Sequence, residues 1–207
     1  MNKKIAIVVG STRKNSLSQK LANNLVSLLP EGYEAEFVRI DNLPLYNQDY
    51  DLEEVETPPT HITFRDQIRS AEGVVFVTPE HNRSISAALK NALDVGSRPY
   101  GHNVWSGVPA LIVSQSPGNI SGFGANHHLR QMLTFLNMPT VQQPEAYIAH
   151  THTLFDENGK INNEDTVKFL HSVINAFVKL VELHTSATLS PHGAEGAKTP
   201  QRKEASS

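Results

Sequence analysis

The chain has 207 residues, of which 39% are hydrophobic and 19% charged, and it contains no cysteine. This length and composition predict a single globular domain, and the lack of cysteine excludes disulfides, iron–sulfur clusters and thiol chemistry. A formal net charge of -3 at pH 7 argues against a nucleic-acid partner, because phosphate backbones are bound by clustered lysine and arginine.

The start of the chain alternates between an apolar run and a helix-like segment. Residues 4–9 carry isoleucine, valine and alanine on both faces, which is typical of a strand inside a sheet. This run is too short for a signal peptide or a membrane span, so we expect a cytoplasmic protein that does not bind membranes. Leucines at spacings of four, four and three residues from Leu17 then predict a helix over residues 16–29.

The same alternation continues along the chain. The expected elements are a strand over residues 34–40, a loop over 41–59, a helix over 61–71, a strand over 74–78, a helix over 86–95, a strand over 109–116, a helix over 126–136, and a short fifth strand near Val141 or over 146–148. Strands that are apolar on both faces and alternate with helices predict a parallel sheet covered on both sides.

A last helix and a polar tail end the chain. One helical stripe of apolar residues is formed by Val167, Leu170, Ile174, Phe177 and Val181. Residues from about 185 onward lack apolar periodicity and are rich in Ser, Thr, Pro, Gly and charge. We therefore predict one α/β domain over residues 1–184 and a disordered tail over residues 185–207.

Polar residues follow the first predicted strand, where a parallel α/β sheet binds its ligands. Gly10 permits a turn, hydroxyl side chains follow, and the next helix begins with free backbone amides, a combination that binds anions. Arg13 can add a charge-assisted contact. The loop lacks the Gly-Lys-Ser/Thr ending of a Walker A motif, and a single glycine does not make a dinucleotide fingerprint. The alternative is an ordinary capped helix with a solvated arginine.

Two further polar loops follow strand ends. Residues 79–84, Pro-Glu-His-Asn-Arg-Ser, present backbone groups that suit the edge of a flat heteroaromatic ring, or else form a turn and cap a helix. Residues 114–124 contain three glycines and a proline, which suit a loop approaching a planar ligand or a flexible surface turn. Between these loops, Ala87, Ala88 and Ala92 form a small-residue face for the core or for a second subunit.

Histidine pairs and hydrolase motifs give weaker signals. Neither His127-His128 nor His150-Thr-His152 is accompanied by a carboxylate pattern or a His-Glu-x-x-His motif. We therefore predict structural or surface histidines and no metal site. No Gly-x-Ser-x-Gly elbow occurs, which argues against a serine hydrolase.

Over about residues 3–182, the chain resembles the NADPH-dependent FMN reductases, the flavodoxin-like quinone, chromate and azo-dye reductases. The motifs that carry the resemblance are Gly10-Ser-x-Arg13-x-x-Ser16, Leu43-Pro-Leu-Tyr-Asn-Gln-Asp49, Pro79-Glu-His-Asn82, Leu89-Lys-Asn91 with Asp94, Ser97-Arg-Pro99 and Ser116-Pro-Gly118. The resemblance implies a five-stranded sheet in the order 2-1-3-4-5, noncovalently bound FMN, and NADPH or NADH as electron donor. It also implies a homodimer or homotetramer with sites at subunit borders.

The cofactor positions of the family carry over residue by residue. The resemblance implies that the FMN phosphate is held by Ser11, Arg13, Ser16, Leu17 and Ser18, and that the flavin ring is lined by Pro79, Glu80, His81 and Asn82 on one side and by Ser116 and Gly118 on the other. Departures from the family pattern are Ser18 for asparagine, His81 for tyrosine, Arg83 for an aromatic or aliphatic residue, Val95 for tryptophan, and Gly124 for an arginine used in some tetramers.

The implied activity is transfer of reducing equivalents from NAD(P)H through FMN to a quinone or a similar small-molecule acceptor. Because the cofactor carries this chemistry, we predict no catalytic acid or base among the side chains. Two alternatives are a flavin reductase that supplies reduced FMN to a partner monooxygenase and a flavodoxin-like electron carrier. Carriers tend to be strongly acidic, so a net charge of -3 over 207 residues disfavours the last of these.

Overall fold

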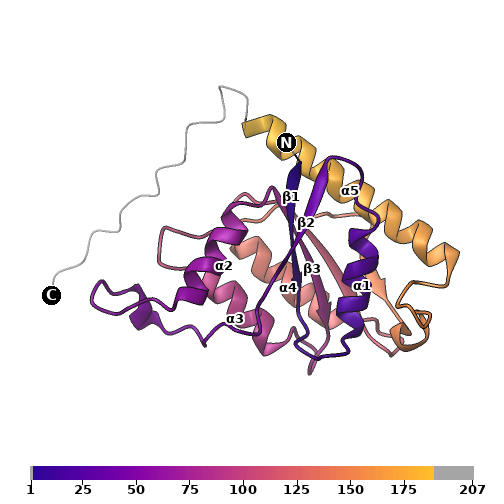
Figure 1. Ribbon diagram of the computed structural model, residues 1–207, viewed down its shortest axis with the longest axis horizontal. Helices are drawn as coiled ribbons and strands as arrows, with labels where there is room; N and C mark the ends of the chain where they lie inside the picture. Colours follow the sequence, from indigo (N-terminus) through magenta and orange to yellow (C-terminus); the bar gives the residue numbers. More distant parts are fainter. Residues whose placement is uncertain (1, 189–207) are drawn as a thin grey trace.

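The computed structural model describes residues 2–188, in which strands and helices alternate along the chain (Figure 1). The elements are β1 (Lys3–Val9), α1 (Leu17–Val26), β2 (Tyr33–Val38), α2 (Pro59–Arg69), β3 (Gly73–Pro79), α3 (Ala87–Gly96), β4 (Ala110–Gln115), α4 (Phe123–Phe135), β5 (Ala146–Ile148) and α5 (Glu164–Thr188). Short 3-10 turns at Gln48–Asp51 and Thr151–Thr153 follow β2 and β5.

The five strands form one parallel sheet in the order β2-β1-β3-β4-β5, which confirms the predicted fold. β1 lies between β2 and β3, so the chain changes its direction of winding across the sheet after β2. This is a topological switch point, and ligands bind beyond the carboxyl ends of the strands beside it. The register pairs Val9 with Val77, which brings the ends of β1 and β3 side by side.

Helices cover both faces of the sheet, as the apolar strands require (Figure 1). α1 and α5 pack on one face through buried residues that include Leu21, Leu25 and Phe177. α2, α3 and α4 pack on the other face through residues such as Ile68 and Leu133. Burial of such side chains is the main source of stability for a sheet that is apolar on both sides.

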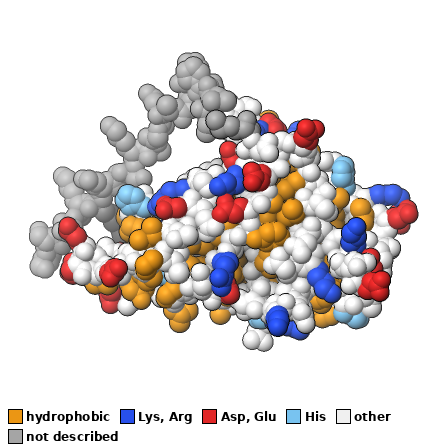
Figure 2. Space-filling view, in the orientation of Figure 1, with side chains coloured by type: hydrophobic (Ala, Val, Ile, Leu, Met, Phe, Trp, Pro, Cys, Tyr) orange, Lys and Arg blue, Asp and Glu red, His pale blue; other side chains and the backbone are white. Residues whose placement is uncertain are grey.

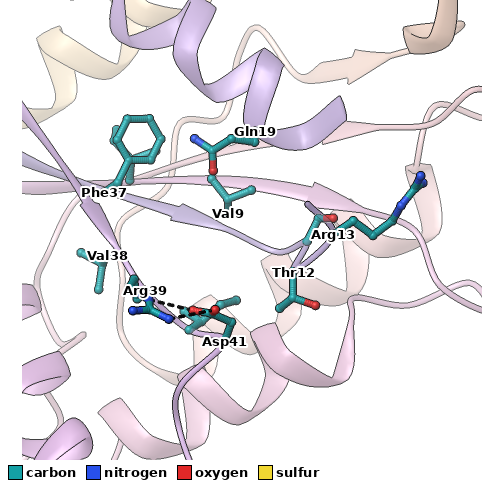
Figure 3. Close-up of a pocket in the computed structure, with 11 residues that line it drawn as sticks. Val9, Thr12, Arg13, Gln19, Phe37, Val38, Arg39 and Asp41 are labelled. Atoms are coloured by element: carbon teal, nitrogen blue, oxygen red, sulfur yellow. Dashed lines mark hydrogen bonds and ion pairs between the residues drawn. The ribbon is translucent and has the colours of Figure 1, made fainter. Parts of the chain in front are cut away.

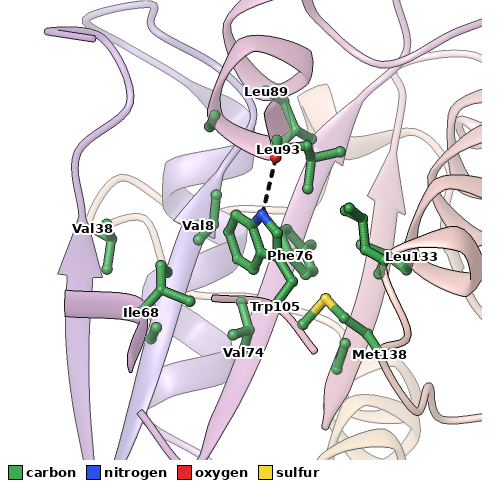
Figure 4. Packing of buried hydrophobic residues seen from close by; sticks show 14 of the residues in the cluster. Val8, Val38, Ile68, Val74, Phe76, Leu89, Leu93, Trp105, Leu133 and Met138 are labelled. Carbon is green, nitrogen blue, oxygen red and sulfur yellow. Dashed lines mark hydrogen bonds between the residues drawn. The ribbon is translucent and has the colours of Figure 1, made fainter. Parts of the chain in front are cut away.

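Trp105 is the largest fully buried side chain, and it fills the space between α2, α3 and the sheet (Figure 4). Its ring lies 5.8 Å from that of Phe64 and 5.7 Å from that of Phe76, measured between centroids. Its indole nitrogen donates to the backbone carbonyl of Leu93 at 3.0 Å, so burial leaves no donor unpaired. A Cβ at Gly96 would collide with this ring, which explains the glycine at the end of α3.

Several element boundaries differ from the sequence prediction by one to three residues, and the fifth strand takes the second of its two predicted positions. α4 begins at Phe123, three residues before the expected start, because Gly122 adopts φ 74° and turns the chain directly into the helix. The fifth strand is Ala146–Ile148; Val141 is buried in the core but lies outside that strand.

The end of α5 bears on the predicted tail. The helix runs to Thr188, so residues 185–188 belong to it and not to an extended tail. The rest of the predicted tail, residues 189–207, lies outside the described residues.

The described surface carries charge of both signs. On the face drawn in Figure 2, acidic and basic side chains are interspersed, and neither sign gathers into one large patch. No helix within residues 2–188 is long and apolar enough to cross a membrane.

Candidate functional site

The three polar loops meet beyond the carboxyl ends of β1, β3 and β4, where they line one cleft. The lining residues are Ser11, Arg13, Ser16 and Leu17 from the first loop, Pro79, Glu80 and His81 from the second, and Gln115, Ser116 and Pro117 from the third. Eight of the eleven predicted site residues are therefore brought together. The other three, Ser18, Asn82 and Gly118, do not line this cleft.

The first loop combines a capped helix start with an unpaired arginine. Ser16 is the N-cap of α1, and its Oγ accepts from the backbone N–H of Gln19 at 3.2 Å. Arg13 is exposed and has no hydrogen bond or ion pair with any residue between 2 and 188. Free amides at a helix start beside an uncommitted guanidinium are suited to bind a phosphate group.

Gly10 brings this loop close to β3 and α3. Its carbonyl accepts from Ser86 Oγ at 2.6 Å, and Ser86 in turn caps α3 by accepting from Leu89 N at 3.2 Å. A side chain at position 10 would crowd Leu89, Thr78 and Pro79, since a Cβ would lie 3.1–3.3 Å from their side-chain atoms. The start of α3 is thereby tied to the end of β1.

The second loop contains a tight two-residue turn. His81 N donates to Ser84 O at 2.8 Å, and Ser84 N donates to His81 O at 2.9 Å. The two residues between them, Asn82 and Arg83, have φ values of 50° and 65°. Positive φ at both central residues is typical of a type I′ turn. The turn presents His81 to the cleft, whereas Asn82 serves the turn itself.

Glu80 joins this turn to α4. Its Oε2 accepts from the backbone N–H of Ala125 at 3.2 Å, and its Oε1 accepts from Arg83 Nη1 at 2.9 Å. A carboxylate at a helix N-terminus is favoured by the free amides and by the helix dipole. The capping role that we considered for Glu80 is therefore present, but on α4 and not on the neighbouring α3. The same side chain also lines the cleft.

A series of buried hydrogen bonds between side chains supports the third loop. Gln115 Nε2 donates to Ser18 Oγ at 2.9 Å, and Gln115 Oε1 accepts from Thr151 Oγ1 at 2.6 Å. Ser18 is fully buried, so its hydroxyl fixes Gln115 from behind the cleft. Ser116 Oγ accepts from Gly118 N at 3.0 Å, and Gly118 shapes the loop.

Sequence reasoning missed Gln115 and Pro117 as lining residues. Both lie in the 114–124 loop that the sequence predicts to approach a planar ligand, but neither is named there as a cofactor residue. For Gln115, the available signal is its polarity at the last position of the apolar strand.

A second hollow lies on the other side of the first loop, between α1 and the end of β2 (Figure 3). Arg39 donates from Nε and Nη2 to the two carboxylate oxygens of Asp41, each at 3.0 Å. These hydrogen bonds lower the pKa of Asp41 below its usual value. Arg13 extends away from this pair in Figure 3, so the two arginines are not directed at one ligand.

A polar cluster beside α2 holds the loop that follows β2. We call it the Asp51 cluster, and it comprises Tyr46, Asp51, His61, Arg65 and Arg98. Asp51 Oδ2 accepts from the Tyr46 hydroxyl and from Arg98 Nε, both at 2.7 Å. Burial, with the hydrogen bond to Asp51, raises the pKa of Tyr46. The long segment between β2 and α2 is therefore fixed by charge-assisted bonds.

Two members of the Asp51 cluster are buried in α2. His61 Nε2 lies 3.0 Å from the carbonyl oxygen of Pro44, so this nitrogen carries the proton. Burial lowers the pKa of His61, and the nearby Arg65 charge lowers it further. Arg65 Nε donates to the carbonyl of Val95 at 2.9 Å, which connects α2 to α3.

The paired histidines of the sequence make ordinary polar contacts. His127 Nε2 lies 3.1 Å from the Tyr147 hydroxyl, and His128 Nδ1 lies 3.0 Å from Ser84 Oγ. Burial, with a hydrogen bond to Glu145, raises the pKa of Tyr147 to about 12. Within residues 2–188, no three His, Cys, Asp or Glu side chains are grouped so as to hold a metal ion.

The cleft has the features that FMN requires. The start of α1 and Arg13 offer donors to a phosphate, and the second and third loops form two walls beyond it, suited to a planar ring.

Comparisons with known proteins point in the same direction. Residues 3–153 match the family model described as NADPH-dependent FMN reductase. The chain is 51% identical over 181 residues to a quinone reductase of Pseudomonas putida, covering 87% of this chain and 95% of the relative. It is 44% identical over 178 residues to a 2-hydroxy-1,4-benzoquinone reductase of a Burkholderia species, covering 86% and 96%.

A solved structure is similar over the same region. The flavoenzyme NAD(P)H:(acceptor) oxidoreductase FerB of Paracoccus denitrificans superposes with a TM-score of 0.82 at 37% sequence identity. The match covers 88% of this chain and 98% of that one.

Proposed function

Because the chain belongs to the NADPH-dependent FMN reductase family, we infer that it is an FMN-dependent NAD(P)H oxidoreductase that reduces quinones or similar acceptors. The observation that carries this inference is the cleft at the switch point. There Arg13, which has no partner among residues 2–188, and the first turn of α1 face the same space as two loops suited to a planar ring. The relatives named as quinone reductases support the choice of acceptor.

We propose that each loop has a separate task in this reaction. Arg13, the hydroxyls of Ser11 and Ser16 and the backbone at Leu17 bind the phosphate, while Ser18 supports the cleft through Gln115. Pro79, Glu80, His81 and Ser116 orient the ring, with Asn82 and Gly118 shaping the two turns. Bound FMN would supply the hydride and electron-transfer chemistry between the nicotinamide and the acceptor, while these residues bind and orient it.

Binding of FMN is the first test. The protein should purify yellow or bind added FMN, and FMN at 100 times its dissociation constant should raise the free energy of unfolding by about 2.7 kcal/mol. Thermal melts with and without FMN measure this directly. A melting temperature that saturating FMN leaves unchanged contradicts the proposal.

Turnover is the second test. The FMN-loaded protein should oxidise NADPH, NADH or both when a quinone is present, as followed by nucleotide absorbance at 340 nm. A flavin reductase would instead oxidise the nucleotide with free FMN as acceptor, and a quinone would not raise the rate of nucleotide oxidation. An electron carrier would react slowly with both nucleotides.

We propose a homodimer or homotetramer that acts in the cytoplasm, where reduced nicotinamide nucleotides are available. An apolar groove between α3 and α4 supports an assembly: it is lined by Leu93, Met132 and Phe135, and Phe135 is 90% exposed. Ala92 is buried in the core, so the small-residue face we considered is divided between core and surface. Light scattering should give an oligomer for the native chain and a smaller species for Phe135→Asp.

A further inference from the structure

Arg83 occupies a backbone position that disfavours a long side chain. It is the second central residue of the turn between His81 and Ser84, where its φ is 65°. Type I′ turns favour glycine there, because a side chain with a Cβ is strained in the left-handed region. Strain of this kind persists where the surrounding structure holds it, and it gathers at functional sites. The side chain of Arg83 therefore merits a functional explanation.

The guanidinium of Arg83 pairs with Glu80, a residue that lines the cleft, although Arg83 is not itself a lining residue. Its Nη1 donates to Glu80 Oε1 at 2.9 Å, and its side chain is 69% exposed, whereas that of Glu80 is 12% exposed. Its other N–H groups have no partner within the described chain, and they remain available to a ligand. Its backbone is tightly enclosed on the α4 side, since a Cβ at Gly124 would lie 2.9 Å from the Arg83 carbonyl oxygen.

The charges around the cleft give this arginine a role. Glu80 is the only carboxylate among the residues that line the cleft, and a partly buried carboxylate repels an anionic ligand. Arg83 pairs with Glu80 and keeps its remaining donors free for a ligand beside that carboxylate. Arg13, the arginine that lines the cleft, is assigned to the FMN phosphate. Arg83, one side chain away from the cleft, is therefore the cation that is left to bind an acceptor.

We propose that Arg83 makes the site selective for acceptors that carry a negative charge, in particular hydroxyquinones. The hydroxyl of a 2-hydroxyquinone is a vinylogous carboxylic acid and is ionised at neutral pH. Its delocalised oxygens match the planar donor fork of arginine. The inference rests on the proposed quinone reductase function, and it adds the charge of the preferred substrate.

Equilibrium binding to the oxidised, FMN-loaded protein tests this without turnover, because a quinone and an oxidised flavin do not react. The probes are 2-hydroxy-1,4-naphthoquinone, an anion at pH 7, and 2-methoxy-1,4-naphthoquinone, a neutral match. Arg83→Gln should weaken binding of the anion about fivefold and leave the neutral quinone unchanged. Arg69→Gln is the matched control, because Arg69 makes the same i,i+3 pair through Nη1, with Asp66 on α2. It should change neither affinity.

A second set of variants separates the effect of the Arg83 charge from the effect of the strained backbone at this position. Arg83→Lys should keep part of the preference for the anion, and Arg83→Gly should lose it as Arg83→Gln does. The glycine variant should also melt about 2 °C above the glutamine variant, because glycine relieves the strain at positive φ. Equal losses for the charged and neutral quinones in Arg83→Gln would overturn the inference. Native protein that reduces neither quinone would instead overturn the proposed function.

Discussion

The cleft and the Asp51 cluster use arginine in opposite ways. In the cleft, Arg13 is exposed and has no partner among the described residues. In the Asp51 cluster, Arg98 donates to Asp51, and the buried Arg65 donates to a backbone carbonyl. Both regions are polar and both follow strands of the same sheet. The difference teaches that an arginine left without a protein partner at a strand end marks a candidate binding site, whereas arginines bonded to protein acceptors mark a structural support.

Removing Asp51 should produce the largest effect on stability. Asp51→Ala leaves Arg98 and Tyr46 without their shared acceptor and removes the negative charge near Arg65. We expect the free energy of unfolding to fall by about 3 kcal/mol. This is the lower end of the loss that follows when a buried ion pair is broken, because the Arg98 side chain is 26% exposed. Urea denaturation measures this loss.

The exposed pair of Asp66 and Arg69 gives the matched control for that experiment. Asp66→Ala should cost less than about 0.5 kcal/mol, because exposed ion pairs contribute little. If both alanine variants lose the same small amount, the Asp51 cluster is not the support that we describe.

Removing Arg13 should have the opposite effect to removing Asp51: the affinity for FMN should fall, and the free energy of unfolding of the FMN-free protein should stay the same. A charge-assisted hydrogen bond contributes roughly 1.5–3 kcal/mol, so Arg13→Ala should weaken FMN binding about tenfold to a hundredfold. Riboflavin has the same ring without the phosphate, and its affinity should be unchanged. Titrating both ligands into both proteins forms a double-mutant cycle that isolates the contact between Arg13 and the phosphate.

Two other observations check the assignment of Arg13. The melting temperature of the FMN-free protein should be the same in Arg13→Ala as in the native chain, because Arg13 has no protein partner to lose. Salt should reduce the advantage of FMN over riboflavin in the native protein. Equal losses for the two ligands would mean that Arg13 only supports the loop.

The sequence predicts local elements well because their signals are periodic. The leucine spacing from Leu17 and the stripe from Val167 to Val181 identify α1 and α5. The middle of each stripe is buried, whereas Leu17, Leu28 and Val167 are half-buried. The three loops of the cleft are also readable, because each follows an apolar strand directly. The order of the strands in the sheet, in contrast, is predicted by the family resemblance, because the periodicity of a strand does not show which strands lie beside it.

The connections between elements could not be predicted from sequence patterns. Gln115 and Ser18 are 97 residues apart, Glu80 and Ala125 are 45 apart, and Asp51 and Arg98 are 47 apart. Such contacts depend on where the sheet places each chain segment, and no local spacing encodes them. The hydrogen bonds of Gln115 to Ser18 and Thr151 are therefore not readable from its place in the sequence.

The Asp51 cluster should also make stability depend on pH. Burial lowers the pKa of His61 in the folded chain below its value of about 6.5 in the unfolded chain. The folded state thus favours the neutral ring, and stability is lost as the pH falls below the unfolded value. The free energy of unfolding should therefore be lower at pH 5.5 than at pH 7.5. Urea midpoints at pH 7.5 and 5.5 should differ more for the native chain than for His61→Gln, and equal differences would contradict this role.

The smallest expected effect comes from removing residues 189–207, which carry no apolar periodicity in the sequence. A chain that ends at Thr188 should keep the native melting temperature and activity. A chain that ends at Leu180 should not, because it loses Val181, which is buried where Gly73 leaves room for it, and Glu182, which accepts from Tyr33 and Lys3 at 2.6 Å. The contrast between the two truncations sets the domain boundary at the end of α5. A drop of several degrees for the chain ending at Thr188 would show instead that residues 189–207 contact the domain or a second subunit.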